Sequence, residues 1–68
     1  MQSKYPNKLK EIRTARGLLQ KDIAKALNIQ LEDRISRWEK GQSIPSLPNL
    51  IKLCRVYKTK IEDLYPEL

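Results

Sequence analysis

Apolar residues recur along the chain at helical spacing, in segments that are separated by turn-forming residues. The first predicted helix covers residues 6–16, because Pro6 suits a first helical position and Gly17 a left-handed stop. The second covers residues 20–27, and Asn28 can adopt the left-handed conformation that ends it. The buried positions expected on these two helices are Leu9, Ile12, Ile23, Ala24 and Leu27.

Three further helices follow in the second half of the chain. A third is predicted from about Leu31 to Lys40, a fourth after the N-cap Ser46, and a short fifth over residues 61–65, ended by Pro66. No segment alternates as a strand does, so the fold class predicted is all-α: a compact five-helix domain, 1–68, with residues 1–5 flexible. The apolar stripe of the fourth helix is expected to be Leu47, Leu50, Ile51, Cys54 and Tyr57.

The net charge of +6 comes from 14 basic and 8 acidic residues, and most of the excess lies within residues 1–40. Such a balance favours a polyanionic partner, usually nucleic acid, although a merely soluble charged surface is the plainer interpretation. A single cysteine, Cys54, excludes an intrachain disulfide, and we expect it to be a small buried hydrophobe. Without histidine, a phosphate-binding glycine loop or a nucleophile–base pair, no enzyme activity, metal or cofactor is expected. No segment resembles a membrane span or a signal peptide, which favours the cytoplasm.

The third predicted helix has two different faces. Projection at roughly 100° per residue gathers Leu31, Ile35 and Trp38 on the core side. The opposite side could enter a DNA major groove or could be a plain solvated face. The acidic residues Glu32 and Asp33 could accept a hydrogen bond from cytosine N4. A structural role is favoured, in which they stabilise the helix dipole in the first turn or hold Arg37 in place. The outward residues are Asp33, Ser36, Arg37 and Lys40, with Arg34 on the flank.

In order and spacing, these segments resemble the Cro/C1-type (XRE-like) helix-turn-helix domains of phage and bacterial repressors. The resemblance runs from Leu9 to Tyr65 and implies a sequence-specific DNA-binding regulator that pairs with a second copy. The matching motifs are Leu9-x-x-Ile12-Arg13-x-x-Arg16-Gly17, Gln20-x-x-Ile23-Ala24-x-x-Leu27, Ile35-Ser36-Arg37-Trp38-Glu39-Lys40-Gly41 and Pro45-Ser46-Leu47. The closing segments Leu50-x-x-Leu53 and Ile61-Glu62-Asp63-Leu64-Tyr65 also fit.

The resemblance also implies roles for individual residues. Those expected to read bases are Asp33, Arg34, Ser36 and Arg37, and those expected to contact the DNA backbone are Gln20, Lys21, Lys40, Gln42 and Ser43. Arg13 and Glu39 resemble a partly buried ion pair that ties the first helix to the third. The interval from Asn28 to Ile35 is one residue longer than the family's usual turn.

Two other functions compete with DNA regulation by a homodimer. The first is a protein-interaction or antitoxin-like module that uses the same fold with weak or no DNA reading. The second is an enzyme, but the sequence lacks the residues that catalysis would need. If the chain does dimerise, the fifth helix and the tail Tyr65–Leu68 are the contact regions expected. The expected partners are therefore double-stranded DNA and a second copy, without a membrane, in a bacterial or phage-encoded cytoplasmic protein.

Overall fold

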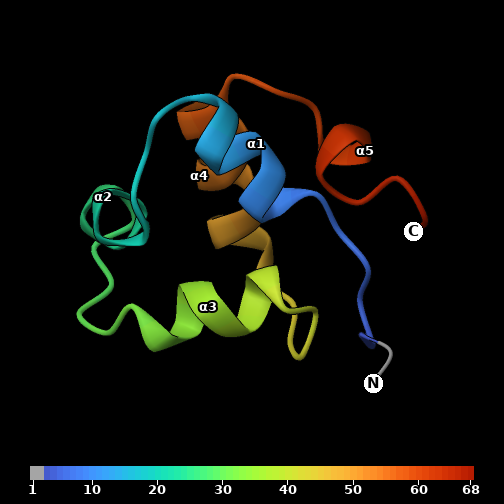
Figure 1. Ribbon diagram of the computed structural model, residues 1–68, viewed down its shortest axis with the longest axis horizontal. Helices are drawn as coiled ribbons and strands as arrows, with labels where there is room; N and C mark the ends of the chain where they lie inside the picture. The colour runs from blue at the N-terminus through green and yellow to red at the C-terminus, as the bar shows by residue number, and fades with distance from the viewer. Residues whose placement is uncertain (1–2) are drawn as a thin grey trace.

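Five helices enclose one small core in the computed structural model, which describes residues 3–68 and contains no strand among them. The α3 helix lies across one end of the molecule, with α2 at one side of it and α1 and α4 above it, and α5 closes the opposite flank (Figure 1). This confirms the all-α, five-helix prediction. The helices are α1 (Leu9–Ala15), α2 (Gln20–Ala26), α3 (Asp33–Glu39), α4 (Leu47–Tyr57) and α5 (Ile61–Leu64).

The first helix is shorter than predicted, because α1 begins at Leu9 and not at Pro6. Asn7 explains the difference: its side-chain oxygen accepts a hydrogen bond from the Leu9 amide at 3.0 Å, which caps the helix there. Ahead of this cap, the Tyr5 amide donates to the carbonyl of Gly41 at 2.9 Å, so the chain runs alongside the end of α3. The predicted flexibility of residues 1–5 stays a prediction, and Met1 and Gln2 lie outside the described residues.

Residues in the left-handed region end three of the helical segments, and the sequence predicts this conformation at the first two. Gly17, Asn28 and Gly41 have φ angles of +68°, +57° and +75°. Gly41 also needs the absence of a side chain, since an added Cβ would lie 2.4 Å from the Cβ of Ser3. Lys58 is a fourth such position, which the sequence did not indicate; its φ of +52° ends α4.

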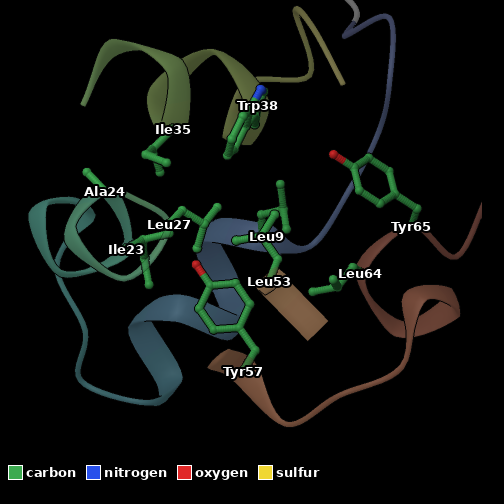
Figure 2. Packing of buried hydrophobic residues seen from close by; sticks show 10 residues of the cluster. All are labelled: Leu9, Ile23, Ala24, Leu27, Ile35, Trp38, Leu53, Tyr57, Leu64 and Tyr65. Atoms are coloured by element: carbon green, nitrogen blue, oxygen red, sulfur yellow. The ribbon is translucent and has the colours of Figure 1, made fainter. Parts of the chain in front are cut away.

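The core is formed by apolar side chains from all five helices and from the residues that end them. Figure 2 shows Ile35 and Trp38 pointing from α3 toward Leu9 of α1 and Leu27 after α2. These residues close one continuous cluster, so the position of α3 is set by burial of its inner face. The buried apolar residues are Leu9, Ile23, Ala24, Leu27, Ile35, Trp38, Leu53, Tyr57, Leu64 and Tyr65.

Three residues that the sequence assigns to buried stripes are exposed instead. Leu31 is 66% exposed because α3 begins at Asp33, so that Leu31 lies in the preceding turn and not on the stripe of Ile35. Leu47 and Ile51 are exposed because the buried face of α4 is centred on Leu53 and Tyr57. At roughly 100° per residue, Ile51 points about 160° away from Leu53. The predicted start of the third helix and the stripe of the fourth were therefore wrong at these positions.

Candidate nucleic-acid interface

Helices α2 and α3 and the turn between them form a rigid helix-turn-helix unit. The left-handed Asn28 turns the chain, and the amide of Ile29 donates to the carbonyl of Ala24 at 2.8 Å. Ile29 is half-buried and packs against the core at this turn. The turn thus holds α3 against α2 through buried contacts, and the opposite face of α3 stays free.

The free face of α3 carries polar side chains of both signs. Asp33, Arg34, Arg37 and Lys40 are exposed, and Ser36 is half-buried. Acidic residues stand at the start of this helix and basic residues at its end, which suits the helix dipole. An exposed helix fits the width of a DNA major groove, and these side chains can form hydrogen bonds with the base edges there.

Two of the expected base-reading residues contact each other on this face. A terminal nitrogen of Arg37 lies 3.8 Å from Oδ2 of Asp33, one helical turn away, and both side chains are largely exposed. Such a pair adds little to stability, but it restrains the arginine in an outward direction. Arg34 is restrained differently: its guanidinium lies 5.6 Å from the centre of the Trp38 ring. This cation–π contact places Arg34 on the flank of the helix.

A buried network anchors the inner side of α3 to α1 and α2. The Nε atom of Arg13 donates to Oε2 of Glu39 at 2.6 Å, and a terminal nitrogen of Arg13 donates to Oε1 at 3.2 Å. The side chains are only 9% and 3% exposed, respectively. Arg13 also donates to the carbonyl of Leu18 at 2.9 Å. The hydrogen bond that Arg13 donates to Glu39 raises the pKa of Arg13, although burial opposes that shift.

Gln20 belongs to the same network. Its side-chain amide donates to Oε1 of Glu39 at 3.0 Å, so a residue expected at the DNA backbone links α2 to the ion pair. Its neighbour Lys21 is exposed and free to reach outward. Together, Arg13, Gln20 and Glu39 fix the relative orientation of α1, α2 and α3, because a buried carboxylate accepts all three hydrogen bonds only in this arrangement.

The loop after α3 carries the remaining residues expected at the DNA backbone. The amide of Gln42 donates to the carbonyl of Arg37 at 2.9 Å, so the loop folds back on the last turn of the helix. Lys40 and Gln42 are exposed, and Ser43 is half-buried. The structure therefore brings Lys40, Gln42 and Ser43 together at one end of α3, while Lys21 lies on α2.

Asn7, which the sequence did not single out, braces this end of α3 from the N-terminal segment. Its amide nitrogen donates to the carbonyl of Trp38 at 2.8 Å and to that of Tyr5 at 2.9 Å. The same Trp38 carbonyl accepts from the Gly41 amide at 3.0 Å, so Asn7 adds a second hydrogen bond to a carbonyl in the last turn of α3. An Asx residue two positions before the apolar Leu9 is the one signal that could have pointed to it.

A second surface feature lies between α4 and α5. It is an open groove of about 530 Å³ with mainly apolar walls. Cys54 lines it and is half-buried, and burial raises the pKa of its thiol. The lining residues are Leu47, Leu50, Ile51, Cys54, Arg55, Thr59, Lys60 and Ile61.

Residues 3–68 contain neither a metal-ligand cluster nor a membrane-spanning helix. No cluster of three or more histidine, cysteine, aspartate or glutamate side chains is arranged to hold a metal ion in this part of the chain. Among the helices described above, none is long and apolar enough to cross a bilayer.

Comparison with known families explains this arrangement of helices. The profile of the helix-turn-helix family matches residues 9–64, which covers all five helices. The chain belongs to the Cro/C1-type (XRE-like) helix-turn-helix family. This confirms the resemblance on which the expected roles of the α3 residues depend.

Relatives of similar length support the same assignment. An uncharacterized HTH-type transcriptional regulator of Methanocaldococcus jannaschii is 39% identical over 59 residues, which are 87% of this chain and 88% of that protein. The regulator YgzD of Bacillus subtilis is 30% identical over 59 residues, which are 87% of this chain and 88% of that protein. A regulator of Archaeoglobus fulgidus is 36% identical over 85% of this chain and 81% of its own.

A solved structure shares the fold. The transcriptional regulator from Listeria innocua superposes with a TM-score of 0.76 and is 25% identical in sequence. The match covers 88% of this chain and 55% of the Listeria chain, so the two correspond over little more than half of the larger protein.

Proposed function

We propose that the chain is a sequence-specific, double-stranded DNA-binding transcriptional repressor that reads the major groove with α3. The observation that carries this proposal is the exposed polar face of α3, held on its inner side by the buried network of Arg13, Gln20 and Glu39. A reading helix must be held rigidly, because base contacts depend on placement within a fraction of an ångström. Membership of a family whose relatives are named as HTH-type transcriptional regulators supports the same function.

The proposed contacts divide into base reading and backbone positioning. Arg37, which points outward from the middle of α3, has the planar donor geometry to bind O6 and N7 of a guanine, and Ser36 lies beside it. Lys21, Lys40 and the loop residues Gln42 and Ser43 flank this face and would contact phosphates. The basic excess supports this arrangement, since residues 1–40 carry ten basic and five acidic side chains.

We further propose that two copies bind as a symmetric dimer through the groove between α4 and α5. Its rim exposes Leu47, Ile51 and Ile61, which a second copy would cover. The two charged residues that line the groove, Arg55 and Lys60, are both basic, so the apolar rim and not charge pairing would hold the two copies together. The tail residue Tyr65, which the sequence suggested as a contact, is 1% exposed and cannot contribute.

Three measurements on a duplex of selected sequence test the proposal. The dimer should protect two half-sites centred one helical turn, about 34 Å, apart. The logarithm of its affinity should fall with the logarithm of salt concentration, by about 0.9 per phosphate neutralised. Sedimentation of the complex should give two chains per duplex, and Ile51→Glu should reduce that number to one.

Each part of the proposal has its own contrary result. A one-to-one complex that protects a single half-site would exclude the dimer and leave DNA reading in place. Absent or salt-insensitive binding would exclude DNA reading and would favour a protein-interaction module on the same fold.

A further inference from the structure

Leu31 is an exposed apolar residue at the entrance to the proposed reading helix. It is 66% exposed, in the turn immediately before α3, and its carbonyl accepts a hydrogen bond from the Arg34 amide at 3.4 Å. Its neighbours Gln30 and Glu32 are also exposed. The backbone bond ties Leu31 to the first turn of α3, so its position follows that of the helix.

Leu31 does not belong to the other apolar surface of the molecule. The groove between α4 and α5 is lined by residues 47–61, none of them from the helix-turn-helix unit. Leu31 lies instead directly before Glu32 and Asp33, at the N-terminal end of α3.

The two ends of this face differ in charge, which indicates how α3 would lie on DNA. Both carboxylates, Glu32 and Asp33, stand at its start, where the one cation, Arg34, lies over the Trp38 ring on the flank. Arg37 and Lys40 stand toward its end. Carboxylates are repelled by phosphates, so the start of α3 suits the floor of the groove and not its phosphate walls. On that floor the bases present amino donors and the thymine C5-methyl group, and N-terminal residues of recognition helices contact these edges.

We infer that Leu31 is a specificity-determining residue that packs against the C5-methyl group of one thymine in each half-site. The inference rests on the proposed DNA-binding function. A leucine can offer a base edge only apolar contact, and thymine is the base whose major-groove edge presents a methyl group. Leu31 would therefore select thymine next to the bases that Arg37 and its neighbours read.

The test replaces thymine by deoxyuridine, which removes the methyl group and keeps base pairing. In a duplex of selected sequence, one thymine position is replaced at a time, in both half-sites together. The affinity of the wild-type chain is measured for each substituted duplex. We expect one position at which deoxyuridine weakens binding by about fourfold per half-site, and so by about 15-fold when both half-sites are substituted, the equivalent of leaving one methyl group unburied in each. With Leu31→Ser, the same replacement should change affinity by less than about 1.5-fold, because the partner of the methyl group is gone.

Leu19→Ser is the matched control, since Leu19 is also an exposed leucine, 55% exposed, at the start of α2. This variant should keep the full deoxyuridine effect. Circular dichroism melts should show that both variants fold, as expected for exposed positions.

The outcomes separate the inference from the function on which it rests. If wild type binds the duplex but loses nothing at any deoxyuridine, or if Leu31→Ser keeps the full loss, Leu31 does not read thymine. If the wild-type chain binds no duplex, the proposed function itself fails.

Discussion

Replacement of Glu39 by alanine should destabilise the domain far more than removal of an exposed charge. The substitution leaves the guanidinium of Arg13 buried without its counter-ion, and it removes the acceptor of the hydrogen bond from Gln20. The bond from Arg13 to the Leu18 carbonyl remains, but a neutral acceptor does not compensate the charge. The inner anchor of α3 would therefore be lost while the cost of burying Arg13 persists.

The expected loss is about 3–5 kcal/mol, which is typical when one partner of a buried ion pair is removed. A domain of this size has a total stability of roughly 3–10 kcal/mol. In a small domain each kcal/mol corresponds to about 4–8 °C in Tm, so we expect Tm to fall by at least about 12 °C.

Urea unfolding followed by circular dichroism measures this loss, and Asp33→Ala is the matched control. Asp33 also pairs with an arginine, at 3.8 Å, but its side chain is 76% exposed, and its removal should cost less than about 0.5 kcal/mol. Equal and small losses for the two variants would refute the reasoning, since they would mean that the Arg13–Glu39 pair is effectively solvated. A double substitution, Arg13→Met with Glu39→Leu, should recover much of the stability, because no buried charge is left alone.

Two further predictions concern the backbone and the buried tyrosines. Gly41→Ala should cost at least about 1 kcal/mol more than Gly17→Ala in thermal melts: both residues have positive φ, but only at Gly41 would the new Cβ meet Ser3, at 2.4 Å. Equal costs would show that the N-terminal segment moves aside freely. Burial raises the pKa of Tyr57 and of Tyr65 to about 12, so stability should be complete below pH 10 and fall between pH 10 and 12, by about 1.4 kcal/mol per pH unit for each tyrosine. Urea midpoints measured across this range should fall less steeply for Tyr65→Phe, and an unchanged slope would contradict the assignment.

The parts of the fold that could be predicted from the sequence depend on local chemistry. The burial of Ile23 and Ile35 follows from helical periodicity, because only one face of each short helix can reach the core. The turns at Gly17 and Asn28 follow from the few residue types that tolerate positive φ. These signals were enough to place the helix-turn-helix unit within the chain.

The parts that could not be predicted depend on long-range packing. Asn7 caps α1, but it also bonds the carbonyl of Trp38, 31 residues away, and no local pattern encodes that contact. Helical projection placed Leu31 in the core because it assumed that α3 had already begun there. Ile51 is exposed because the neighbours of α4 cover only the side that carries Leu53. Each error concerns a helix face or boundary that tertiary contacts decide.

Selection of bound sequences from a random duplex library, with three forms of the chain, tests most directly whether α3 reads DNA. The wild type should select a two-fold symmetric site that contains a guanine in each half-site. Arg37→Ala should bind that site more weakly, by about 1–3 kcal/mol per lost bidentate contact, and should no longer prefer the guanine. Lys40→Ala should select the same site as the wild type and bind all duplexes more weakly. If Arg37→Ala keeps the wild-type sequence preference, or if the wild type enriches no sequence, the account of α3 as a reading helix is wrong.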